Sequence, residues 1–206
     1  VFTHFACSDE PYDSMTRRQF GAFSAFCGLC EKGGLGLGMR HCCNSAAIVN
    51  FPEMHLDAVR AGILLYGLSP NPGVTDAAGL LPCMTLKANV VQLSHIRKGD
   101  TVSYGAAFVS DRDMTVATLS VGYADGLFRA LSGKADVVIR GKKAKMVGKI
   151  CMDMCMADVS DIDCEVGDEA VIFGDGQSAD RLAELAGTIN YEILCSVRNR
   201  VSRRYI

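Results

Sequence analysis

The sequence has no tryptophan, only 5 prolines among 206 residues, and no apolar run that approaches the roughly 20 residues of a membrane-spanning helix. Lysine and arginine (21 residues) nearly balance aspartate and glutamate (23), so the basic excess typical of nucleic-acid-binding domains is missing. The first residues, Val1–Ala6, lack the charged region and cleavage site of a signal peptide. The composition therefore argues against membrane and nucleic-acid roles and favours a soluble, cytoplasmic globular protein.

Cysteine, in contrast, is abundant, with 10 residues at irregular spacing. Cys27 and Cys30 form a C-x-x-C pair, which could bind a metal or form a redox disulfide. No second C-x-x-C pair follows and no histidine stands at zinc-finger spacing. We therefore expect no metal site, and a reduced chain that uses cysteine as a small hydrophobic residue.

The first 70 residues alternate short apolar runs with helical patterns, which predicts an α/β arrangement with a parallel sheet. The helix over Ser14–Lys32 is expected to end at Gly33–Gly34, and Asn44 is a polar cap before a further helix. Three such units are too few to close a barrel of eight. The expected elements are strands at Val1–Ala6, Met39–Cys43 and Ala58–Gly67, and helices at Ser14–Lys32, after Asn44 and from Pro52.

A turn-rich link at residues 69–82, which includes Pro72 and Gly73, separates this region from a series of short β-like runs. The pattern predicts two domains, residues 1–78 and 79–206, the second an all-β sandwich or barrel. The predicted strands are Thr85–Leu93, Thr101–Val109, Met114–Val121, Ala135–Ile139, Lys145–Val147 and Ala170–Phe173; two helices, Ser178–Leu185 and Ile189–Ser196, and a closing strand, Arg200–Ile206, are expected to follow.

Two tyrosines stand beside glycines in this β-rich half, Tyr104 in Thr101–Gly105 and Tyr123 in Val121–Gly126. Glycine allows the backbone to approach a ligand closely, while the phenol stays exposed. A tyrosine has a reference pKa near 10, so it acts as a base only where nearby cations lower that value. The candidate cations are Arg60, Arg129 and Lys149.

These stretches resemble the C-terminal part of the bacterial alanine racemases, pyridoxal-phosphate enzymes of fold type III. The resemblance covers nearly the whole chain in the order of the family. It rests on THFACSDE (3–10), HCCNSAA (41–47), VRAGILLYGLSP (59–70), VSYGAAF (102–108), SVGYADGLFRALS (120–132), VGKICMDM (147–154), GDEAVIFG (167–174) and TINYEILCSVRNRV (188–201).

The resemblance implies the end of a TIM-like (β/α)8 barrel followed by a β-domain, in a head-to-tail homodimer. It also implies racemisation of L- and D-alanine for peptidoglycan supply, with two bases on opposite faces of the substrate. Tyr104 matches one base. The other is a Schiff-base lysine whose motif finds no match here, nor does an upstream arginine that contacts substrate. The 206 residues alone are therefore expected to be inactive, without covalently bound cofactor.

The resemblance assigns further residues to the cofactor. Arg60 matches the arginine that faces the pyridine nitrogen, and His4 matches the histidine behind it. An arginine stays protonated, so it does not transfer a proton to the pyridine nitrogen, which remains largely neutral. The phosphate-binding positions are matched by Ser45, Gly62, Ile63 and Tyr191.

Substrate contacts are implied at Met152, through its backbone N–H, and at Tyr123. The corridor by which substrate reaches the site is matched by Asp9, Asp125, Arg129 and Lys149. Lys149 departs from the pattern, because the family commonly has arginine there. Lysine cannot form the paired hydrogen bonds of a guanidinium, which affects the hydrogen bonding expected in the corridor.

Two alternatives remain open. One is a serine or broad-specificity racemase of the vancomycin-resistance type, against which the bulk of Tyr191 favours alanine. The other is a non-catalytic structural module.

Overall fold

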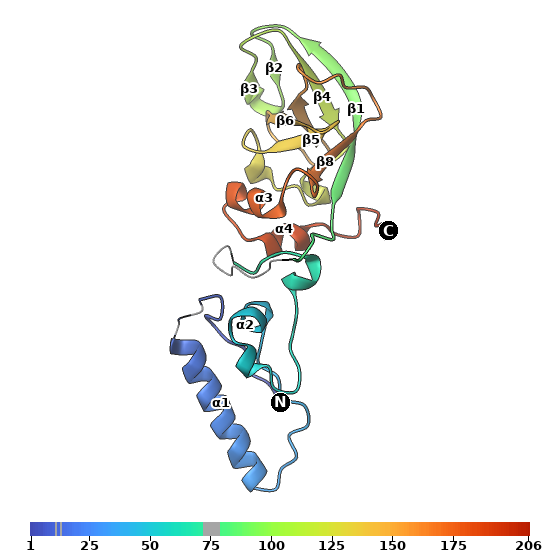
Figure 1. Cartoon of the computed structure of the whole chain (residues 1–206). Helices are drawn as coiled ribbons and strands as arrows, with labels where there is room; N and C mark the ends of the chain where they lie inside the picture. Colours follow the sequence, from blue (N-terminus) through green and yellow to red (C-terminus); the bar gives the residue numbers. More distant parts are fainter. Residues whose placement is uncertain (11, 13, 72–78) are drawn as a thin grey trace. The chain divides into compact units, whose positions relative to one another are not determined.

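The structure is a computed structural model that describes residues 1–10, 12, 14–71 and 79–206. Within it the chain forms two compact units, Val1–Cys83 and Met84–Ile206, which are described separately (Figure 1). The boundary expected between residues 78 and 79, and Pro72 and Gly73 of the expected link, lie at or within residues 72–78, outside the described residues.

The helices of the first unit follow local sequence signals. Helix α1 spans Ser14–Lys32 as predicted, and ends where the Gly33 N–H donates to Leu29 O and Gly34 takes a φ of 78°. Helix α2, Ser45–Asn50, begins where the Asn44 side chain accepts the Ala47 N–H at 3.0 Å. Two 3₁₀ helices follow, η1 (Pro52–Met54) and η2 (Ile63–Tyr66).

The three predicted strands of this unit form only isolated parallel bridges, Phe2 with His41 and His41 with Ala58. The expectation of a strand over Ala58–Gly67 was wrong beyond its first residue. Gly62 leaves the β region, and Gly67 caps η2 in the left-handed conformation. An apolar run as short as Ile63–Tyr66 fits a helical turn as well as a strand.

Cysteines contribute to the core of this unit as apolar side chains. Cys42 and Cys43 are fully buried, and Cys27 nearly so. Burial raises the pKa of the Cys43 thiol to about 12, so the group stays neutral. Among the residues that the structure describes, no three or more metal-binding side chains cluster. The core residues are Phe5, Phe23, Cys27, Cys42, Cys43, Ala47, Phe51 and Met54.

The second unit contains a closed antiparallel barrel in the order β1-β4-β7-β6-β5-β8 (Figure 1). Strand β1 closes it, because irregularities at Leu86/Lys87 and Val90/Gln92 let one part pair with β8 and the other with β4. The strands are β1 (Leu86–Ile96), β4 (Met114–Leu119), β5 (Asp136–Ile139), β6 (Lys142–Val147), β7 (Cys155–Asp158) and β8 (Glu169–Phe173).

Two predictions for this unit were wrong. The run Thr101–Val109 is not one strand but a hairpin, β2 (Thr101–Val102) and β3 (Phe108–Val109), around the 3₁₀ turn η3 (Tyr104–Ala106). Residues 200–206 form no strand, and the barrel is closed without them, so it offers no free edge for a further strand. Strand β7 was not anticipated, because Cys-Met-Ala-Asp carries no β-branched or aromatic residue.

The remaining elements flank the barrel. Helix α3 (Ala179–Ala186) begins as predicted, with Ser178 accepting the Arg181 N–H, and α4 spans Asn190–Ser196. Two 3₁₀ turns, η4 (Tyr123–Asp125) and η5 (Arg129–Leu131), follow β4. Across the described part of the chain, no helix has both the length and the apolarity to cross a membrane. The α/β unit and the β-barrel together give the expected fold class.

Candidate active site

Tyr104 stands on the η3 turn between β2 and β3, with 75% of its surface exposed. The hairpin is anchored beneath it, because Val102 and Phe108 pack against a buried cluster that includes Val116 and Met156. The phenol therefore projects from a well-packed hairpin and is not buried in the core.

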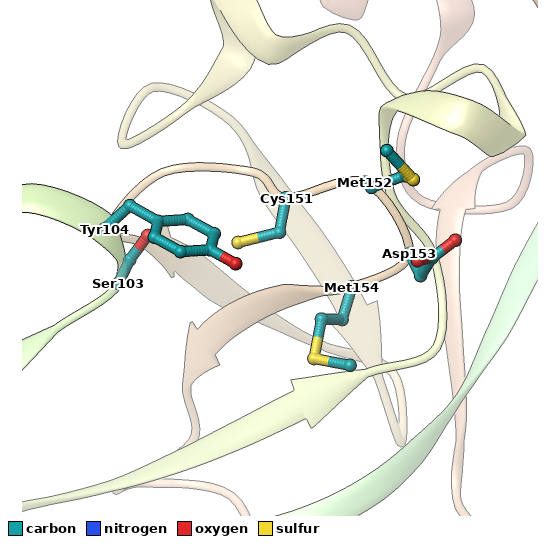
Figure 2. Close-up of a pocket in the computed structure, with 6 residues that line it drawn as sticks. All are labelled: Ser103, Tyr104, Cys151, Met152, Asp153 and Met154. Atoms are coloured by element: carbon teal, nitrogen blue, oxygen red, sulfur yellow. The ribbon is translucent and has the colours of Figure 1, made fainter.

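A pocket of about 390 Å³ opens beside this tyrosine. Figure 2 shows the Tyr104 phenol directed toward the loop that precedes β7. The lining residues are Ser103, Tyr104, Cys151, Met152, Asp153 and Met154. Two predicted site residues, Tyr104 and Met152, therefore share one cavity.

The second predicted tyrosine, Tyr123, is fastened to the same loop by backbone hydrogen bonds. The Tyr123 N–H donates to Cys151 O at 2.9 Å, and the Ala124 N–H donates to Met152 O at 3.0 Å. Gly122 permits this approach, since a Cβ there would lie 2.3 Å from Met152 O.

Asp125 completes this turn. Its Oδ2 accepts the Gly122 N–H at 2.9 Å, and its Oδ1 pairs with Arg200 Nε at 2.8 Å. Arg200 also pairs with Asp153 of the pocket loop. One guanidinium therefore connects the η4 turn with the pocket lining.

The two cations predicted for the second unit lie on separate segments. Arg129 begins η5 and is exposed, while the half-buried Lys149 lies in the segment between β6 and the pocket loop. The Lys149 ammonium lies 3.4 Å from the point where a Cβ on Gly105 would be, so it borders the Tyr104 turn. Neither residue lines the pocket itself.

In the first unit, the Arg60 guanidinium is held between two histidines. Its Nη1 donates to His41 Nδ1 at 2.8 Å, and its Nη2 donates to His4 Nδ1 at 3.0 Å and to Thr3 O at 3.1 Å. Arginine has no acceptor, so both Nδ1 atoms must accept, and the proton of each neutral ring sits on Nε2. The predicted pair of Arg60 and His4 is thus a contact in the structure.

His41 is a site residue that the sequence reasoning missed, although the quoted stretch HCCNSAA begins with it. Its ring stacks on Phe2, with centroids 5.4 Å apart and planes at 1°, and the Arg60 guanidinium lies over the Phe2 ring. The signal available was its position in the strand expected at Met39–Cys43, three residues before the capping Asn44.

Ser45 and Gly62, both predicted to bind the phosphate, contact each other in the structure. The Gly62 N–H donates to Ser45 Oγ at 2.8 Å, which leaves the serine hydroxyl proton free to turn toward an acceptor such as a phosphate oxygen. Ile63, buried, follows directly at the start of η2. A hydroxyl and backbone N–H groups beside a glycine suit a phosphate.

The two remaining predicted residues belong to different units. Asp9 is half-buried and belongs to the first unit, whereas Tyr191 is half-buried in α4 of the second. The predicted residues thus form two groups, one around Tyr104 in the second unit and one around Arg60 and Ser45 in the first.

Comparison with known families matches both units. Residues 1–70 match the family model "Alanine racemase, N-terminal domain", and residues 83–205 match "Alanine racemase, C-terminal domain". An alanine racemase of Desulfovibrio desulfuricans is 47% identical over 208 residues, which cover 100% of this chain and 56% of that protein. The chain thus spans about half the length of the curated relatives it matches.

Solved structures agree. The alanine racemase of Streptomyces lavendulae superposes with a TM-score of 0.94 at 40% identity, covering 100% of this chain and 56% of that one. The alanine racemase of Bartonella henselae, solved with covalently bound pyridoxal phosphate, has a TM-score of 0.87 at 32% identity, with the same coverage of both chains. On both its sequence and its fold, the chain belongs to the alanine racemase family.

Proposed function

We propose that this chain provides the tyrosine base and part of the cofactor pocket of a pyridoxal-phosphate-dependent alanine racemase. The observation that carries the proposal is the exposed Tyr104 phenol beside a pocket that Met152 also lines. The family membership and the bound cofactor of the B. henselae relative support the choice of chemistry.

The first unit has groups that fit the cofactor. Ser45, Gly62 and Ile63 would hold its phosphate, together with Tyr191 of the second unit. Arg60, which is held by its bonds to His41 and His4, would face the ring nitrogen. When bound, pyridoxal phosphate supplies an electron sink that makes the α-hydrogen of an amino acid acidic.

Tyr104 would move that hydrogen. As a phenolate it would accept the proton from the α-carbon on one face, and as the resulting phenol it would return a proton there, while a lysine acts on the opposite face. The Met152 N–H would position the substrate carboxylate, with Tyr123 beside it. Asp9, Asp125, Arg129 and Lys149 would line the corridor by which substrate arrives.

The assembly belongs to the proposal as well. A head-to-tail homodimer would bring the second unit of one protomer to the first unit of its partner, in a cytoplasmic enzyme that supplies D-alanine for peptidoglycan. The proposal also includes that the 206 residues alone do not racemise alanine, which a coupled D-alanine assay checks.

The decisive experiment is Tyr104→Phe in the full-length protein. Removal of a general base lowers kcat about 100-fold to 10,000-fold, because the phenol oxygen that carries the proton is lost. A coupled assay measures L- to D-alanine conversion. Tyr205→Phe, which alters an exposed tyrosine of the same unit, is the matched control and should keep wild-type kinetics. A Tyr104→Phe enzyme as fast as the control would end the proposal.

The substrate is tested in the same assay. Serine in place of alanine is expected to give the lower kcat/KM, since the bulk of Tyr191 narrows the space for a side chain. A preference for serine would favour the broad-specificity racemase instead.

A further inference from the structure

We infer that Ser103 is a positioning residue for Tyr104: its hydroxyl ties the tyrosine turn to the Lys149 backbone and sets where the phenol stands. The inference rests on the proposed function of Tyr104. Ser103 acts through the turn and has no part in the proton transfer itself.

The first observation is the backbone of Ser103. Its φ of 73° and ψ of 172° fall in a region that is essentially restricted to glycine. Two further residues of the turn have positive φ, Gly105 at 69° and Ala106 at 48°. A conformation this unfavourable persists only where surrounding contacts hold it, and such residues cluster at functional sites.

The second observation identifies those contacts. Ser103 Oγ accepts the Lys149 N–H at 2.9 Å and donates to Lys149 O at 2.9 Å. One side chain therefore satisfies both backbone groups of a residue 46 positions away in the sequence. Each group would otherwise lose a hydrogen bond in a half-buried segment.

The third observation is the tight contact behind the serine. Gly148 has a φ of 70°, and a Cβ on it would lie 2.6 Å from Ser103 Cβ and 3.1 Å from Val102 O. The two segments thus approach as closely as a glycine permits. This approach also brings the Lys149 side chain alongside Gly105, next to Tyr104.

These contacts define what Ser103 does. Tyr104 is mostly exposed, so packing around its own ring does not fix its position. Its Cα is instead fixed through the preceding residue, which is bonded to the segment that leads into the pocket loop Cys151–Met154. A base displaced by about 1 Å can lose on the order of 100-fold in rate, so this link matters for catalysis.

The test uses Ser103→Gly and Ser103→Ala in the full-length protein. Glycine adopts the observed backbone readily, so Ser103→Gly keeps the fold even if Ser103→Ala does not. Both variants should lower kcat about 10-fold or more, with KM changed less than about threefold. Hydrogen exchange followed by mass spectrometry should show the Lys149 amide exchanging at least about 10-fold faster.

Ser160→Ala is the matched control. Ser160 Oγ also accepts a backbone N–H, that of Thr115 at 3.0 Å, and donates to Asp158, but it lies beyond the far end of β7 from the pocket loop. Its loss should leave kcat unchanged and the Lys149 amide protected.

A double variant separates positioning from a general structural role. In a Tyr104→Phe background, Ser103→Gly should lower kcat by less than about a further twofold, because the phenol oxygen that Ser103 positions is already gone. Additive losses would overturn the inference, as would wild-type kcat in Ser103→Gly. If Tyr104→Phe alone leaves the activity intact, the proposed function fails, and the exchange of the Lys149 amide still decides whether Ser103 holds this turn.

Discussion

At the scale of single residues, the environment decides the chemistry of identical side chains. Cys155 is buried in the barrel, and burial raises the pKa of its thiol to about 12. Cys83 and Cys195 are exposed. The thiolate is the reactive form, so the ten thiols should differ strongly in reactivity.

We expect iodoacetamide at pH 8 to label Cys83 and Cys195 in the folded chain, and to leave Cys43 and Cys155 unlabelled. At that pH a thiol with a pKa of about 12 is almost entirely protonated as well as shielded. Peptide mass spectrometry gives the labelled fraction at each site, and the same reaction in urea is the control in which all should react. Labelling of native Cys155 as fast as Cys195 would contradict the buried position.

Ser103 shows a second residue-scale effect. A non-glycine residue in its backbone region costs about 1–3 kcal/mol, which its two hydrogen bonds to Lys149 offset in part. Strain of this kind is typical of a residue held for function and not for stability.

At the scale of elements, the turn η4 depends on one carboxylate. The Asp125 side chain is only 13% exposed and bonds both the Gly122 N–H and Arg200. Asp153 shares the same arginine but is 49% exposed. A buried acceptor is costly to remove, whereas an exposed ion pair contributes little.

Asp125→Ala should therefore lower the free energy of unfolding by about 1–3 kcal/mol, because it leaves the Gly122 N–H without its acceptor. Asp153→Ala is the matched change and should cost less than about 1 kcal/mol. Urea unfolding followed by circular dichroism measures both values. Equal losses in the two variants would show that the shared arginine, and not the bond to Gly122, holds the turn.

At the scale of the whole molecule, the two units differ in how extensively their extended segments pair through backbone hydrogen bonds. Each barrel strand of the second unit has a neighbour on both sides. In the first unit, the segments at Phe2, His41 and Ala58 pair only by single bridges. An exposed strand edge invites aggregation, and a closed barrel has no such edge.

Residues 84–206 expressed alone should therefore unfold in one cooperative transition. The barrel contains its own core, with Leu119, Ile139 and Ile172 fully buried. Urea titration followed by both circular dichroism and tyrosine fluorescence should give coincident curves, since small single domains unfold in two states. Transitions at different urea concentrations would show that the barrel needs residues outside this range.

Local sequence signals predicted several elements of this structure. Helices α1, α2 and α3 could be predicted because their caps and stops lie within three or four residues of the groups they satisfy, as at Asn44 and Ser178. The family motifs indicated the fold class and proposed Tyr104, Arg60 and Ser45 as site residues. The barrel strand β7 and the absence of a strand at residues 200–206 could not be predicted, because pairing partners and not composition decided them.

The sequence by itself determined which side chains were available, where helices α1, α2 and α3 begin, and the family to which the chain belongs. Only the tertiary structure decided that His41 supports Arg60 across 19 residues and that Ser103 bonds Lys149 across 46. A hydrogen bond between segments so far apart depends on how the intervening chain folds. No pattern within a few residues specifies which distant segments meet. Contacts of this kind are therefore seen only in the folded structure.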